Sequence, residues 1–125
     1  MQSMHLQKHI PNWLEMNIWL LVKIKNPDET EIISQLVSAI EYFNRKNIKV
    51  DLVIIDEEKN KYEQYTYERI YEIINSKALN YLLNINGGIH VIKINNINND
   101  EMNLLYACSN IILNAHYDLL EEAVW

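Results

Sequence analysis

Glycine, proline and cysteine are scarce in this chain, which has two glycines, two prolines and one cysteine in 125 residues. Flexible linkers and low-complexity segments are rich in glycine and proline, so we do not expect them here. The single cysteine, Cys108, cannot form an intramolecular disulfide. Free cysteines are typical of reducing compartments, which predicts a cytoplasmic location.

Long apolar runs are also missing. The longest runs, residues 18–24 and 50–55, are too short for a membrane-spanning helix, which needs about 20 apolar residues. The first ten residues include His5, Lys8 and His9, which argues against a secretory signal peptide. We therefore expect no membrane insertion by this segment.

Acidic residues outnumber basic ones, and the formal net charge is −6. No cluster of basic residues extends beyond Arg45-Lys46. Proteins that bind nucleic acids gather several cations on one surface to contact the phosphates. The composition therefore predicts no nucleic-acid partner.

Hydrophobic residues make up 49% of the chain, and their spacing alternates between strand and helix patterns. A chain of this length is expected to form a single domain. Runs of large and β-branched residues predict strands at 16–24, 49–56, 89–94 and 110–115. The second run is almost continuously apolar, which indicates burial on both faces, as in a parallel sheet.

Helical patterns separate these strands. The sequence Asn26-Pro27-Asp28-Glu29 combines a capping residue, a proline and acids suited to a first turn, and apolar residues three and four apart follow it to about residue 44. Further helices are predicted at 62–76 and 99–109, with a short helical piece at 78–83. Asn98 and Glu101 have the spacing of a capping box for the 99–109 helix.

The resulting order, β-α-β-α-β-α-β, calls for right-handed crossovers between parallel strands. We therefore predict an α/β fold, a three-layer αβα sandwich around a four-stranded, mostly parallel sheet. The domain is expected to span residues 16–116, with an irregular lead-in at 1–15 and a tail at 117–125.

Ligands of open parallel sheets bind beyond the carboxyl ends of the strands. No glycine-rich phosphate loop follows any of the predicted strands. Gly87-Gly88 precedes its strand and is interpreted as a tight turn that needs a positive φ. The chain therefore offers no nucleotide-binding loop.

The best-placed polar residues are Asp56, Glu57 and Glu58, directly after the second predicted strand. They could bind Mg²⁺ or accept a phosphoryl group, as in a receiver-like regulatory module. The further acid, hydroxyl and lysine that a receiver needs do not line up in the sequence. A solvated loop with acids at a helix start is the simpler interpretation.

Other catalytic patterns are weak. His5 and His9 are four residues apart, but no third metal ligand follows at a suitable spacing. Cys108 lies within an apolar helical pattern, which favours a buried thiol over a nucleophile paired with His90 or His116. No metal, cofactor or catalytic residue is therefore predicted.

Tyrosines are frequent, and Tyr62 and Tyr65 are the aromatic candidates for a ligand or docking surface. Exposed aromatic rings can stack on sugars, so a stand-alone carbohydrate-binding module is an alternative function. At helical spacing, tyrosines more often belong to a core or an interface.

Three strings carry a family resemblance: MNIWLLVKI (16–24), EYFNRKNIKVDLVIIDEEKNKYEQ (41–64) and NGGIHVIKINNINNDEMNLLYACSNIILNA (86–115). In order and spacing, they resemble a non-catalytic α/β segment of the cyclic β-1,2-glucan synthases and their glycosyltransferase 36-type relatives. Those large enzymes join a glycosyltransferase region to a region similar to cellobiose phosphorylase. The similar segment lies between β-sandwich portions, ahead of the phosphorylase-like barrel. The resemblance covers roughly residues 12–115.

The resemblance implies a scaffolding or docking domain, from a fragment or a relative of a large β-glucan-processing enzyme. Its partners would be neighbouring domains of that enzyme, with the glucan chain as a second candidate. The family's catalytic acid lies in the barrel, so no catalytic residue is carried over to this chain. The resemblance weakens at both ends, because residues 9–13 replace a glycine-bearing turn and residues 116–118 replace a more basic stretch.

Overall fold

The computed structural model describes residues 18–58 and 64–115. Within these ranges the strands are β1 (Ile18–Ile24), β2 (Val50–Asp56), β3 (Ile89–Lys93) and β4 (Ile111–Asn114). The α-helices are α3 (Glu31–Arg45), α4 (Tyr65–Ser76) and α5 (Asn99–Cys108), and short 3₁₀ turns form at Pro27–Glu29, Asn80–Leu82 and Ile94–Asn96. The predicted lead-in and tail, and Tyr62, lie outside the described residues.

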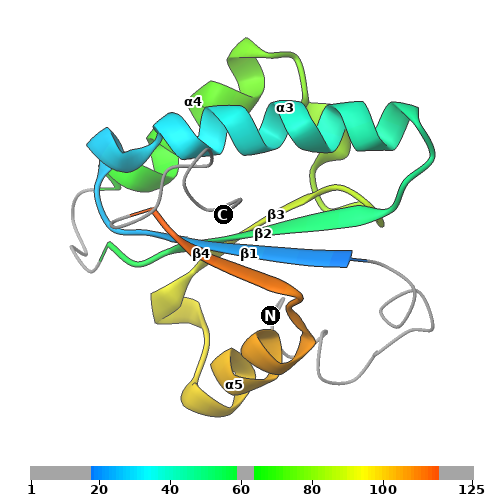
Figure 1. Cartoon of the computed structure of the whole chain (residues 1–125). Helices are drawn as coiled ribbons and strands as arrows, with labels where there is room; N and C mark the ends of the chain where they lie inside the picture. The colour runs from blue at the N-terminus through cyan, green and yellow to red at the C-terminus, as the bar shows by residue number, and fades with distance from the viewer. Residues whose placement is uncertain (1–17, 59–63, 116–125) are drawn as a thin grey trace.

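The four strands form one sheet, all parallel, in the order β3-β2-β1-β4. Helices α3 and α4 cover one face of the sheet, and α5 covers the other (Figure 1). The predicted three-layer α/β architecture is therefore confirmed, and the sheet is wholly parallel. Strand order reverses between β1 and β4, which makes the carboxyl ends of these two strands the switch point of the sheet.

β2 is the most interior element, because all seven of its residues are buried. Its alternating side chains divide between two apolar clusters. Leu52 and Ile54 pack beneath α3 and α4, whereas Val53 and Ile55 face α5. The almost unbroken apolar sequence of this strand follows from its having a helical layer on each side.

The long helix α3 supplies most of the upper layer. Its buried residues repeat at intervals of three and four and form one stripe along the helix. They are Ile32, Ile33, Leu36, Val37 and Ile40. The predicted amphipathic helix is thus confirmed, although it starts later than the sequence suggested.

Asn26 begins a single 3₁₀ turn, Pro27–Glu29, and α3 starts only at Glu31. The cause is local, because the carboxylate of Glu29 accepts hydrogen bonds from the backbone N–H groups of Lys25 (3.0 Å) and Asn26 (3.3 Å). These bonds complete a tight turn before the α-helix begins.

The other boundaries shift for similar reasons. The predicted helical piece at 78–83 is reduced to one 3₁₀ turn, Asn80–Leu82, after Ala78 takes a left-handed conformation with a φ of 57°. β3 ends at Lys93, because Ile94 already belongs to a 3₁₀ turn. The capping box of α5 is confirmed: the Glu101 N–H donates to Asn98 Oδ1 (2.8 Å), and the Asn98 N–H donates to Glu101 Oε1 (2.9 Å).

The two glycines before β3 serve different purposes. Gly87 has a φ of 76°, which confirms the predicted positive φ. Gly88 is required by close packing, because a Cβ there would lie 2.1 Å from the carbonyl oxygen of Leu82. The turn therefore depends on both residues.

We expect Gly88→Ala to destabilise the domain by at least about 3 kcal/mol, because the new methyl group meets a backbone oxygen that cannot rotate away. Gly87→Ala should cost less, about 1–2 kcal/mol, because its main penalty is the left-handed backbone. Urea unfolding followed by circular dichroism measures both values. An equal or reversed ranking would contradict the packing described for Gly88.

Candidate functional site

The predicted acidic residues lie at the carboxyl edge of the sheet, where β2 turns into the segment before α4. Asp56 is the last residue of β2, and Glu57 and Glu58 follow it. This is the edge where parallel sheets bind ligands. The side chains of Asp56 and Glu58, however, accept hydrogen bonds from different backbone N–H groups.

Asp56 is 1% exposed. One of its carboxylate oxygens, Oδ1, accepts a hydrogen bond from the Glu58 N–H at 3.0 Å. Burial raises the pKa of Asp56, and the nearby charge of Glu58 adds to the rise, while the hydrogen bond and the charge of Lys93 oppose it. A phosphodonor would have to reach this carboxylate, and its burial therefore gives no support to the receiver-like hypothesis.

Glu57 and Glu58 tie the end of β2 to other backbone segments. The Glu57 N–H donates to the carbonyl oxygen of Ile24 at 2.7 Å, which extends the pairing of β2 with β1. Glu58 Oε1 accepts from the N–H of Thr66 in the first turn of α4 at 3.2 Å. A carboxylate at this position caps the helix and meets the positive end of its dipole.

In the turn after β1, two backbone N–H groups that could bind a phosphate are already hydrogen-bonded within the protein. In dinucleotide-binding folds, the N–H groups of this first βα turn point at a phosphate. Here the Glu29 carboxylate accepts from both Lys25 N–H and Asn26 N–H, and Asn26 Nδ2 donates to Glu29 Oε2 at 3.1 Å. An internal acid thus takes the position of an external anion.

Tyr65 is the predicted aromatic residue that the structure describes, and it is 56% exposed at the start of α4. The neighbouring ring of Tyr67 is covered by Lys93, whose Nζ lies 4.7 Å from the ring centroid. Tyr67 also donates its hydroxyl to the hydroxyl of Tyr71 (3.4 Å), and burial together with this contact raises the pKa of Tyr71. These tyrosines do not form an open stacking platform.

A second polar network lies at the opposite, amino edge of the sheet, and no sequence motif pointed to it. Asp51 is fully buried in β2. Its Oδ1 accepts from Gly87 N–H (2.8 Å) and Gly88 N–H (3.3 Å), and it lies 3.0 Å from His90 Nε2. An acid inside the apolar run KVDLVIID, together with the Gly-Gly pair before β3, was the available clue.

This pair of Asp51 and His90 resembles part of a hydrolytic relay, in which a histidine activates a nucleophile. No hydroxyl or thiol of the described residues hydrogen-bonds to His90. His90 lies on β3, which is an edge strand of the four-stranded sheet. The network therefore fastens the turn before β3 to β2 and has a structural role.

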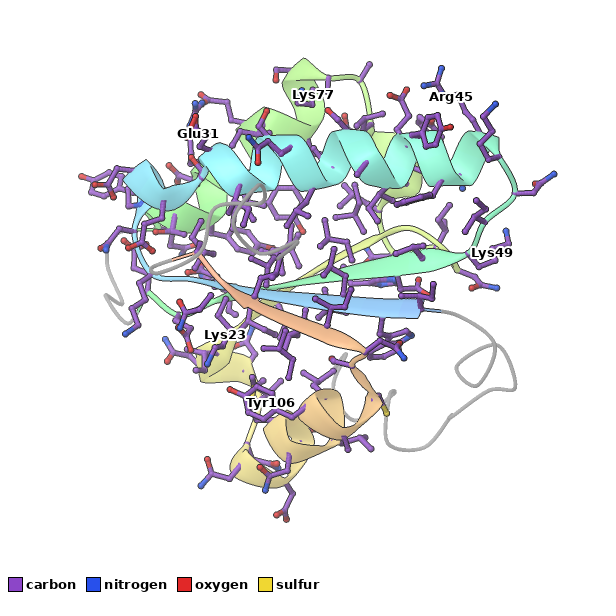
Figure 2. All side chains as sticks on the ribbon, in the orientation of Figure 1. Lys23, Glu31, Arg45, Lys49, Lys77 and Tyr106 are labelled. Atoms are coloured by element: carbon purple, nitrogen blue, oxygen red, sulfur yellow. The ribbon has the colours of Figure 1, made fainter. Side chains whose placement is uncertain are left out.

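The face covered by α5 holds four further polar or reactive side chains, those of Lys23, Glu101, Tyr106 and Cys108. Lys23 Nζ donates to the Tyr106 hydroxyl at 3.3 Å, and Figure 2 shows both side chains on this side of the sheet. Burial raises the pKa of the Cys108 thiol, which favours its neutral form. Glu101 Oε1 caps α5, whereas Oε2 is buried and has no hydrogen-bond partner among residues 18–58 and 64–115.

An open groove runs along the outer helical layer, between the start of α3 and the length of α4. Its charged lining residues are Asp28, Glu31, Arg69 and Lys77, and all four are exposed. Because these charges are exposed to solvent, the attraction between them is screened.

No three His, Cys, Asp or Glu side chains in ranges 18–58 and 64–115 gather as metal ligands.

No protein-family profile matches the chain, and no curated protein matches it. In the part of the chain that the structure describes, no helix has the length and apolar character needed to cross a membrane.

We expect Asp51→Ala to destabilise the domain by about 3–5 kcal/mol, because it leaves two buried N–H groups and His90 without their acceptor. His90→Ala should cost less, about 1–2 kcal/mol, because both glycine N–H groups keep their partner. Chemical denaturation of the two variants provides the measurement. A loss below about 1 kcal/mol for Asp51→Ala would show that the network does not hold the fold.

The raised pKa of Asp56 predicts a pH dependence. The folded protein retains the Asp56 proton above the ordinary pKa of 3.8, so the contribution of this group to stability falls as the pH rises through that window. Asp56→Asn removes the buried charge and keeps an acceptor for the Glu58 N–H. Relative to the unmodified protein, this variant should therefore gain stability as the pH rises above 3.8.

Thermal unfolding across that pH range measures the difference, with Asp28→Asn as an exposed control. A relative stability of Asp56→Asn that stays flat or declines with pH would contradict the burial of the charged carboxylate.

Proposed function

We propose that this chain is a non-catalytic scaffolding and docking domain of a large β-glucan-processing enzyme, of the cyclic β-1,2-glucan synthase type. The observation that carries the proposal is the ordered resemblance of three separate strings over roughly residues 12–115. In the enzymes that these strings resemble, the similar segment stands outside the catalytic regions.

The polar contacts of the domain support a structural role. Asp51 and Asp56 each use a carboxylate oxygen to accept a hydrogen bond from a backbone N–H group. The two buried threonines donate their hydroxyls to backbone carbonyls: Thr30 to Pro27 at 2.8 Å, and Thr66 to Lys25 at 3.5 Å. Hydrogen bonds from buried polar side chains to their own backbone are what a structural role requires.

The resembling strings also contain the residues that hold the sheet together. The string at 41–64 includes Asp51 and Asp56, and the string at 86–115 includes the glycine turn and His90. A shared scaffold is expected to retain residues of this kind. Its neighbours in a larger enzyme would be the domains that the scaffold positions.

The direct test exchanges the corresponding segment of a cyclic β-1,2-glucan synthase for residues 12–115 of this chain. We expect the chimera to retain synthesis of cyclic glucan, because the segment supplies a folded spacer. The same chimera carrying Asp51→Ala is the matched control, and it should lose activity as the inserted domain unfolds.

The isolated chain should leave β-1,2-glucan intact in the presence of inorganic phosphate, with no release of glucose 1-phosphate above the level without protein. Turnover by the isolated chain would refute the non-catalytic role. An inactive chimera whose inserted domain is folded would refute the scaffold role.

A further inference from the structure

The open groove on the outer helical layer has the size of a small-molecule site. Its volume is about 630 Å³, and such sites occupy about 300–1,000 Å³. The 3₁₀ turn Pro27–Glu29 and the start of α3 form its first wall, and α4 forms its second wall. Figure 2 shows Glu31 and Lys77 on the outer side of this layer. A ligand can therefore reach the groove directly from solvent.

The charged groups of the groove are separated by sign. The carboxylates of Asp28 and Glu31 belong to the first wall, and the cationic side chains of Arg69 and Lys77 belong to the second. Within the described part of the chain, no hydrogen bond or ion pair engages the side chains of Asp28, Glu31 or Lys77. Arg69 pairs with Glu72, and its guanidinium has five N–H donors in all. Acceptors on one wall and donors on the other thus remain available to a ligand.

Hydroxyl groups make up most of the remaining lining, from Thr30, Ser34 and Ser76. The hydroxyls of Thr30 and Ser76 each donate to a backbone carbonyl at 2.8 Å, so their oxygens can still accept a hydrogen bond. Apolar lining is limited to Pro27 and Ile73, and Ile73 is buried. The groove therefore offers a ligand mainly polar contacts.

This lining favours one class of ligand. An anion would meet the carboxylates of the first wall, and a cation would meet the cationic side chains of the second, so each is repelled on one side. An apolar ligand would displace water from four charged groups and gain little contact. A neutral ligand rich in hydroxyl groups suits both walls, because each hydroxyl can donate to a carboxylate and accept from a cation.

We infer that this groove binds a neutral carbohydrate, and that the carbohydrate is a stretch of β-1,2-glucan. The identity of the glucan rests on the proposed function, whereas the choice of a neutral sugar rests on the lining of the groove. The domain then holds part of the glucan chain outside the catalytic regions of the larger enzyme. Because the groove is open, it leaves much of the sugar in water, and we expect a Kd on the order of 1 mM.

Titration of the full chain with β-1,2-linked gluco-oligosaccharides, followed by backbone amide chemical shifts, tests the site. We expect the largest shifts at Thr30, Ser34 and Ser76, which line the groove. Shifts that centre on another surface, or no shifts at concentrations well above 1 mM, would overturn the inference. The scaffold role is measured separately by the chimera, so the two can fail independently.

Variants of the groove test its residues. Glu31→Ala and Lys77→Ala should each weaken binding about fivefold, the effect of losing one hydrogen bond, and both should stay folded because both side chains are exposed. Glu68→Ala and Lys46→Ala are the matched controls and should bind like the unmodified chain. Glu68, like Glu31, is exposed in the first turn of a helix, and Lys46, like Lys77, is an exposed C-cap residue. Equal affinities in groove and control variants would overturn the inference.

Two comparison ligands test the class of sugar. Glucose 1-phosphate should bind no more tightly than glucose, because the carboxylates of the groove repel its phosphate. Tighter binding of the phosphate would overturn the choice of a neutral ligand. Cello-oligosaccharides, which have β-1,4 linkages, should bind more weakly than β-1,2-linked oligosaccharides of the same length. Equal or tighter binding of the cello-oligosaccharides would overturn the assignment to β-1,2-glucan.

Discussion

The contact between Asp51 and the turn before β3 determines how the remaining parts of the domain are placed. β2 is buried along its whole length, and a carboxylate inside such a strand is stable only when donors surround it. Gly87 and Gly88 supply two backbone donors, and His90 supplies a third group. The bonds set where β3 begins against β2, and hence which side chains of β3 face each helical layer.

At the opposite end of β2, Asp56 also accepts a backbone hydrogen bond, from the N–H group of Glu58. Its single hydrogen bond to the Glu58 N–H shapes the turn that leads toward α4, and Glu58 in turn caps that helix. The polar residues at the carboxyl edge are therefore engaged in connecting strand, turn and helix. At this edge, where many α/β proteins bind ligands, Asp56 and Glu58 accept hydrogen bonds from backbone N–H groups of the protein itself.

Much of the fold could be predicted from the sequence, because period-two and period-3.6 patterns report directly on burial. The continuous apolar run of β2 and the stripe on α3 are examples. The start of α3 could not be predicted to the residue, since it depends on how the Glu29 side chain folds back onto Lys25 and Asn26. The order of the strands in the sheet could not be predicted from the hydrophobic patterns either. The position of β4 beside β1 depends on which face of the sheet the last crossover covers.

The candidate site was harder to predict than the fold. Because Asp56, Glu57 and Glu58 follow a predicted strand, the sequence correctly placed them at the carboxyl edge of the sheet. Their spacing alone could not show that Asp56 is buried or that Glu58 accepts a hydrogen bond from Thr66. Asp51 and the Gly87-Gly88 pair are 36 and 37 residues apart, so their contact exists only in the folded sheet. Long-range pairing of this kind leaves no local pattern in one sequence.

Amide hydrogen exchange at Gly87 and Gly88 tests most directly whether the buried carboxylate of Asp51 is what fastens the sheet. The account predicts that both amides exchange as slowly as the amides at the centre of β2, because they open only when β3 detaches from β2. Exchange at the rate of an unprotected turn would contradict it, since the two N–H groups would then be bound to water and not to Asp51.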